Sequence, residues 1–226
     1  MRPGLLRPAS RVAAQARAHV HAFGSPEYWT AFYADPRHKR FEWFVDAERA
    51  LALMRPRLRA LRAARVLHVG AGTSTLGPSL ATDGVDEVVN LDVDEDACRL
   101  AEAAWREEVS RHAHGASPHA CSWHTGDLRA LPAHWSERFD AAVDKGTTDA
   151  LVFAGGDSAA RALHEVARCL RPGGELWMIT DDPPENRVEL LRESLPHWAV
   201  SFTEVSSEAA GADSWQYYLY TAQKVK

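Results

Sequence analysis

The sequence has 226 residues and a mass of 25.0 kDa, which is long enough for one sizeable hydrophobic core and predicts a single folded domain. Its formal net charge is -5 and its pI is near 6.1, so the chain lacks the basic field that holds a nucleic-acid backbone. No apolar run approaches the length needed to cross a bilayer. Neither nucleic acid nor a membrane is therefore expected as a partner.

The N-terminal segment differs in charge from the rest of the chain. Residues 1–25 contain four arginines and many alanines but no Asp or Glu, which is the composition of a mitochondrial transit peptide. A disordered or weakly helical tail on a cytoplasmic protein has the same composition. A mitochondrial and a cytoplasmic location both stay open, and the folded domain is expected to span residues 26–226.

Two helical segments are expected before the sheet, at Pro26–Tyr33 and Phe41–Leu61. From Arg65 onward, short apolar runs alternate with amphipathic stretches, which is typical of a parallel sheet with crossover helices. The predicted strands comprise, in chain order, residues 65–69, 88–91, 120–124, 139–143, 175–180, 199–205 and 215–222. The further helices are expected up to about 82, from about 95, at 157–170 and at about 187–195.

Two turn signals complete the prediction of the fold. Arg171-Pro172-Gly173-Gly174 places glycines just past a predicted helix and indicates its end. Gly211-Ala212-Asp213 joins the last two predicted strands, which suggests an antiparallel hairpin at one sheet edge. The sequence therefore predicts an α/β fold with a doubly wound, mostly parallel seven-stranded sheet and an antiparallel C-terminal hairpin.

A glycine-rich turn, Gly70-Ala71-Gly72, follows the first predicted strand. Glycines let the backbone approach a ligand closely, and the next helix offers its free amides there. Asp92 ends the second predicted strand about twenty residues later, where a carboxylate can accept hydrogen bonds from both hydroxyls of a ribose. Thr75 stands where a dinucleotide fingerprint has its third glycine, which weakens a nicotinamide reading.

Two more acids are expected at strand ends. Asp127 follows the third predicted strand within Gly126-Asp127-Leu128, and Asp144 ends the fourth. The carboxyl ends of parallel strands meet at one edge of the sheet, so these acids extend the series begun by Asp92. Asp127 is placed to bind an adenine amino group, and capping of the next short helix is its alternative role. The series predicts a nucleoside cofactor.

Further motifs lie along the chain. They are Tyr28-Trp29 with Tyr33, Phe41-Glu42-Trp43-Phe44, Val66 to Ser74, Asp144-Lys145-Gly146-Thr147 with Asp149-Ala150-Leu151, Leu170 to Gly174, and Tyr217-Tyr218-Leu219-Tyr220. Together they resemble the seven-strand methyltransferases that use S-adenosylmethionine, within them the branch that methylates lysines of elongation factor 1A and citrate synthase. The resemblance covers nearly the whole chain from Tyr28, and Thr180-Asp181-Asp182-Pro183 with Arg187 is most similar to the mitochondrial citrate synthase enzyme.

The resemblance implies S-adenosyl-L-methionine as cofactor and a protein lysine as acceptor. The residues that it implies for cofactor binding are Trp29, Gly70, Ala71, Gly72, Asp92, Val93, Asp127, Leu128 and Asp144. Asp144 is expected to lie beside the reacting methyl group and orient the acceptor, with Trp43, Trp29 and Tyr33 closing the pocket. The catalytic residues expected are therefore Asp144, Trp43 and Tyr33.

Methyl transfer to lysine sets two electrostatic requirements. The ammonium, with a pKa of about 10.4, must lose a proton before its nitrogen can attack. Aromatic walls lower that pKa by desolvation, and a carboxylate can orient the ammonium or receive the proton through water. Lys145 would repel a sulfonium, so it is expected to pair with an acid or to point outward.

One residue departs from the family pattern and keeps alternatives open. His68 stands where many relatives carry an acid that touches the amino-acid end of the cofactor, so that contact is expected to be weaker or made otherwise. A catalytically inactive cofactor-binding protein is one alternative, and a small-molecule methyltransferase is another because the fold does not choose a substrate. A nicotinamide enzyme is a distant further one. The histidines and cysteines show no metal-ligand spacing, and no metal is expected.

Overall fold

The computed structural model describes residues 23–111, 117–206 and 216–225. Most of the basic N-terminal segment and the predicted loop at Gly211-Ala212-Asp213 lie outside these described residues. Among the described helices, none is long and apolar enough to cross a bilayer.

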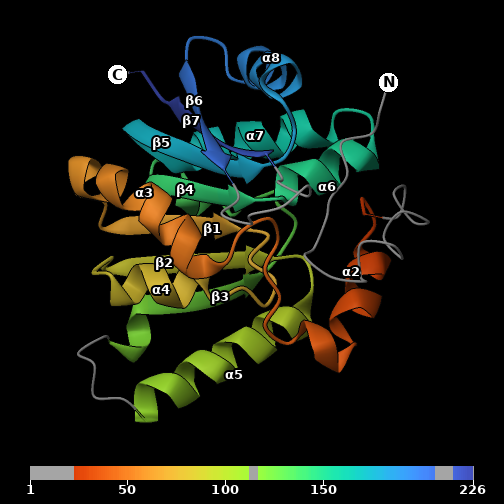
Figure 1. Ribbon diagram of the computed structural model, residues 1–226, viewed down its shortest axis with the longest axis vertical. Helices are drawn as coiled ribbons and strands as arrows, with labels where there is room; N and C mark the ends of the chain where they lie inside the picture. Colours follow the sequence, from red (N-terminus) through yellow and green to blue (C-terminus); the bar gives the residue numbers. More distant parts are fainter. Residues whose placement is uncertain (1–22, 112–116, 207–215, 226) are drawn as a thin grey trace.

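One seven-stranded sheet forms within the described ranges, in the order β3-β2-β1-β4-β5-β7-β6 (Figure 1). Neighbours from β3 to β5 are parallel, and β7 is antiparallel to both β5 and β6. The strands are β1 (Arg65–Val69), β2 (Glu87–Asp92), β3 (Cys121–Thr125), β4 (Phe139–Lys145), β5 (Leu170–Thr180), β6 (Ala199–Ser206) and β7 (Gln216–Gln223). The predicted fold class is confirmed. Strand order reverses between β1 and β4, which is where ligands bind such sheets.

Helices cover both faces of the sheet, which explains why nearly every residue of β1 and β4 is buried instead of every second one. Met54, Leu80 and Trp105 join the core on one face, and Leu163 and Leu191 join the core on the other. The helices are α2 (Pro26–Tyr33), α3 (Ala47–Leu61), α4 (Leu76–Thr82), α5 (Glu95–Arg111), α6 (Thr147–Ala154), α7 (Ser158–Cys169) and α8 (Pro184–Ser194). Helix α2 stands beyond the carboxyl ends of the parallel strands (Figure 1).

The helix predicted from Phe41 to Leu61 begins later, at Ala47. Asp46 caps it, because the Asp46 side chain accepts a hydrogen bond of 2.7 Å from the backbone N–H of Arg49. The preceding residues are not helical, and Phe44 has a positive φ of 62°. The start of this helix was therefore predicted wrongly, and residues 41–46 are free to approach the sheet edge.

Three other elements differ from the prediction by more than two residues. Helix α6 was not anticipated, and α8 begins at Pro184. Strand β5 begins at Leu170, before the turn that was expected to precede it. Gly173 and Gly174 remain paired, because Gly173 N donates to Lys224 O and Lys224 N donates to Gly174 O.

Candidate functional site

A pocket with about 720 Å³ of empty space, part of it open to solvent, lies at the carboxyl ends of β1, β2 and β4 beneath α2. Of the residues predicted from the sequence, those that line it are Trp29, Tyr33, Trp43, Gly70, Asp92, Val93, Asp127 and Leu128. Ala71, Gly72 and Asp144 are not part of its lining. The structure therefore brings eight of the eleven predicted residues to one cavity.

The glycine turn after β1 requires glycine for two reasons. Gly70 and Gly72 have φ values of +57° and +50°, a left-handed conformation that side chains disfavour. A Cβ on Gly70 would overlap the hydroxyl of Thr147, and a Cβ on Gly72 would overlap the hydroxyl of Tyr33. The turn thus passes directly under α2 and beside the start of α6.

Asp92 closes the floor of the pocket at the end of β2. Its carboxylate accepts hydrogen bonds from Gly72 N at 2.7 Å and from Asp94 N at 2.9 Å. It is only 5% exposed, and burial raises its pKa to about 6. A carboxylate accepts about four hydrogen bonds, so capacity remains for ligand hydroxyls.

Helix α2 is fixed over the pocket by a polar contact. The hydroxyl of Thr30 donates to Asp94 Oδ2 at 2.7 Å, and Asp94 Oδ1 accepts from Ala97 N at 2.8 Å in the first turn of α5. Ser25 begins α2 by accepting a hydrogen bond from Tyr28 N. The two helices are therefore joined beside Asp92.

Four aromatic rings form the wall that faces Asp92. Trp29 stacks on Tyr33 and meets Trp43 edge to face, with both centroid distances 6.1 Å. Phe23 approaches Trp43 edge to face at 6.4 Å, and its carbonyl accepts a hydrogen bond of 2.8 Å from Trp29 Nε1. Phe23 was not predicted, because it lies in the segment read as a tail. Such a wall excludes water and attracts cations.

Asp127 lines the pocket but is already paired. Both its oxygens contact the Arg129 guanidinium at 2.8–3.1 Å, and Oδ1 also accepts from Arg129 N. The hydrogen bonds from Arg129 lower the pKa of Asp127. An adenine amino group would therefore share this carboxylate with Arg129.

Glu42 ties the glycine turn to the end of β4. Its carboxylate accepts from Ser74 Oγ and Thr75 N, both at 2.8 Å, and pairs with Lys145 Nζ at 2.8 Å. Lys145 also donates to Trp43 O at 3.1 Å. The expectation that Lys145 pairs with an acid is confirmed. Glu42 was quoted within a motif but was given no role, since its partners are distant in sequence.

His68 lies under the turn and away from the pocket surface. It is 1% exposed, and its Nδ1 lies 3.0 Å from Asn90 Oδ1. Burial lowers its pKa to about 4, so the ring is neutral at pH 7. His68 is not among the residues that line the pocket.

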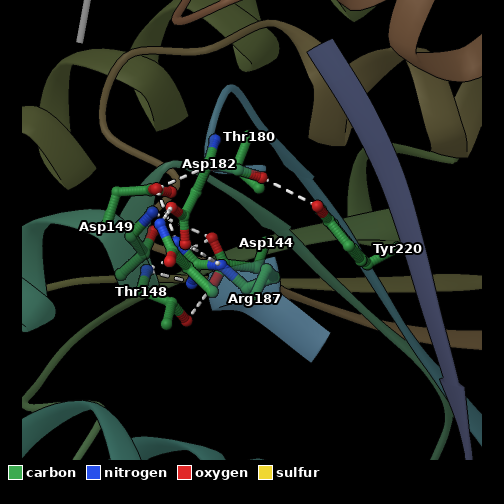
Figure 2. A network of polar contacts seen from close by, with 9 residues as sticks. Asp144, Thr148, Asp149, Thr180, Asp182, Arg187 and Tyr220 are labelled. Carbon is green, nitrogen blue, oxygen red and sulfur yellow. Dashed lines mark hydrogen bonds and ion pairs between the residues drawn. The ribbon is translucent and has the colours of Figure 1, made fainter. Parts of the chain in front are cut away.

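Asp144 belongs to a buried polar network on the face of the sheet that packs against α7 and α8 (Figure 2). Its oxygens accept from Thr147 N at 2.8 Å and from the N–H and hydroxyl of Thr148, in the first turn of α6. Nearby, Arg187 pairs with Asp149 at 2.7 Å and with Asp182 at 3.1 Å. Asp144 is 2% exposed, and burial raises its pKa to about 6.

The comparisons with known proteins agree with this geometry. A family model described as "Methyltransferase domain" matches residues 66–174. The chain is 32% identical over 192 residues to the mitochondrial citrate synthase-lysine N-methyltransferase of Pongo abelii, covering 78% of each chain. It is 30% identical over 163 residues to the eEF1A lysine and N-terminal methyltransferase of Danio rerio, covering 70% of this chain and 21% of that protein.

A solved structure shows the same fold. The magnesium protoporphyrin IX methyltransferase of Synechocystis PCC 6803 with bound SAM has a TM-score of 0.58 and 15% sequence identity, covering 79% of this chain and 78% of that chain. The described residues fit such a cofactor, because Asp92 offers buried acceptors for ribose hydroxyls and aromatic rings face the cavity. The chain belongs to the family of S-adenosylmethionine-dependent methyltransferases that includes the citrate synthase-lysine N-methyltransferases.

Proposed function

We propose that this chain methylates a lysine side chain of another protein, with citrate synthase as the first candidate acceptor and elongation factor 1A as the second. Relatives named for these two acceptors support the substrate class. The observation that carries the proposal is the pocket itself, in which a buried carboxylate faces four aromatic rings. Such a cavity suits a nucleoside that carries a cationic centre and an acceptor that must shed water.

The cofactor, when bound, supplies a methyl group on a positively charged sulfur. Asp92 would hold the ribose hydroxyls, and Gly70 would let the backbone approach. Trp29 would cover the cofactor from α2. The charge of Lys145 is compensated by Glu42, so it does not oppose the sulfonium.

The acceptor must arrive as a neutral amine. Rings such as Trp43 and Tyr33 exclude water and so lower the pKa of an ammonium that enters between them. Asp144 would contribute through α6, because its oxygens fix the first turn of the helix that supplies Thr147 and Ala150 to the pocket.

Labelled methyl transfer tests the proposal. The purified chain is incubated with methyl-labelled S-adenosylmethionine and either citrate synthase or elongation factor 1A, and mass spectrometry locates the modified lysine. Asp92→Ala should abolish labelling in parallel. Cofactor binding without label in either protein would refute the proposal, and label in the small-molecule fraction of a lysate would indicate a small-molecule methyltransferase.

We also propose a mitochondrial location. The basic, acid-free composition of residues 1–25 and the mitochondrial name of the relative from Pongo abelii support it. A fluorescent fusion of the full chain should reach mitochondria, and a fusion that lacks residues 1–25 should stay in the cytoplasm. Cytoplasmic fluorescence of both fusions would overturn the proposal.

A further inference from the structure

Asp181 follows the last residue of β5 and continues its alternation. Trp177 and Ile179 belong to the core beneath α3 and α4, whereas Met178 belongs to the core on the opposite face. Since side chains alternate along a strand, Asp181 points to the same face as Ile179. Asp182 fits this alternation of side chains, because it pairs with Arg187 on the opposite face.

Tyr217 lies across from Asp181. Strand β5 pairs with β7 through Thr180 and Tyr218, so the next step of the antiparallel register sets Asp181 against Tyr217. Tyr217 shares its face with Ile179. The two side chains are close enough that the charge of Asp181 contributes to the raised pKa of Tyr217, after burial.

Aromatic rings connect the methyltransferase pocket to this carboxylate. Gly146 lines the pocket, and a Cβ added to it would lie 3.1 Å from Phe44 Cε2. The ring of Phe44 lies 5.7 Å from that of Tyr217, centroid to centroid. Lys145, which lines the pocket at the end of β4, pairs in register with Ile179 on β5, two residues before Asp181.

Phe44 is held there at a conformational cost. Its φ of 62° is left-handed, a conformation that is uncommon for a bulky side chain. The surrounding structure keeps this ring between Gly146 and Tyr217.

Asp181 has no partner that would explain its position. Within the described ranges, no side chain donates a hydrogen bond to its carboxylate and no cation pairs with it. The charges that act on it are those of Asp149 on α6, Asp182, and Arg187 on α8, and it acts in turn on the phenol of Tyr217. On the neighbouring strand β4, Lys145 pairs in register with Ile179 and is held by Glu42. Both cations in that set are committed to other carboxylates. Burial, followed by the charge of Asp149, raises the pKa of Asp181 to about 7.

We infer that Asp181 binds the ammonium of the acceptor lysine and takes its proton, beside the rings of Phe44 and Tyr217. In that step one N–H bond breaks, its electron pair stays on nitrogen as the attacking lone pair, and the proton joins a carboxylate oxygen before passing to water. An arriving ammonium would supply the missing partner of Asp181. The inference rests on the proposed function and adds the acceptor residue that it lacks.

The test compares Asp181→Asn with Asp182→Asn, a neighbouring charge removal on the opposite face. Transfer to whichever of citrate synthase and elongation factor 1A takes label is followed from pH 6 to 9, because the wild-type rate should rise as Asp181 ionises near pH 7. Asp181→Asn should lower kcat about 100-fold and remove this rise of the rate with pH. Asp182→Asn should keep the rise.

Two measurements without turnover accompany the kinetics. Asp181→Asn should weaken binding of the acceptor protein to the S-adenosylhomocysteine complex at least tenfold and leave S-adenosylhomocysteine affinity within twofold. Its melting temperature at pH 8 should be equal to or above that of the wild type, because an unpaired half-buried charge has gone. An unchanged rate and pH profile, with wild-type transfer intact, would overturn the inference alone. Absence of transfer by the wild type would overturn the proposed function as well.

Discussion

Asp92 at the end of β2 and Asp144 at the end of β4 share a residue type, deep burial, and a pKa raised by that burial to about 6. Both accept hydrogen bonds from backbone amides, Asp92 from Gly72 N and Asp94 N and Asp144 from Thr147 N. Asp92 nevertheless faces the pocket, whereas the Asp144 oxygens are taken by Thr147 and Thr148. In the proposed function, the buried carboxylate of Asp92 would serve a ligand, whereas that of Asp144 holds the first turn of α6.

The polar network around Asp144 should show its importance in the stability of the protein. Replacing Arg187 by Met leaves Asp149 buried without its cation, which should cost about 3–5 kcal/mol of unfolding free energy. Urea unfolding measures it, with exposed Arg192→Met on the same helix as the control. A loss below about 1 kcal/mol would mean that the network contributes little.

The nucleoside side should respond in binding. Gly72→Ala adds a Cβ against the Tyr33 hydroxyl at a left-handed position, and should weaken S-adenosylmethionine roughly 100-fold, or about 2.7 kcal/mol. Gly156→Ala is the matched control, because Gly156 has φ +60° and no atom within 4 Å of an added Cβ. Calorimetry should find Gly156→Ala within twofold of the wild type, and equal losses in both would assign the effect to backbone strain.

The two aspartates can be separated directly. Asp144→Asn turns an amide donor toward the N–H groups of α6, which should lower the unfolding free energy by about 1–3 kcal/mol while the folded protein keeps most of its cofactor affinity. Asp92→Asn should do the reverse. If thermal melts and calorimetry show similar losses for Asp144→Asn and Asp92→Asn, the two aspartates do not differ in role.

A pH titration gives the smallest effect and the sharpest assignment. In the proposed function, ribose hydroxyls would donate to the ionised form of Asp92, so cofactor affinity should be full above its pKa of about 6 and fall below it. The expected loss between pH 7 and pH 5 is about tenfold. Asp92→Asn should bind more weakly with no such slope, and a slope kept by that variant would assign the titration to another group.

Much of the sheet was predictable because its strands are buried on both faces and read as apolar runs. Predictions were weaker where a long-range partner decides the structure. Strand β5 extends back to Leu170 because the chain after β7 pairs with Gly173 and Gly174, which no local pattern indicates. Helix α3 starts at Ala47 because Asp46 caps it, although the apolar pattern continues upstream.

The site divides in the same way. Asp92 and Gly70 each follow directly from a strand end, which is a local feature, so the sequence predicted both as pocket residues correctly. The end of β4 was predicted equally well. Successive side chains of a strand point to opposite faces, however, so a shift of one residue decides whether Asp144 or Lys145 contacts the N-terminal aromatic residues. Glu42 was missed because its contacts with Thr75 and Lys145 exist only after folding.

The segment from Phe23 to Trp43 has a consequence for how such enzymes diversify. The shared family region, residues 66–174, supplies the strand ends and the carboxylate floor, yet all four rings of the wall come from upstream of it, as does Glu42, which ties the glycine turn to β4. The shared region can therefore keep binding the cofactor while the segment before residue 66 changes to admit another acceptor. Relatives that diverge in this N-terminal segment should share the cofactor and differ in the acceptor.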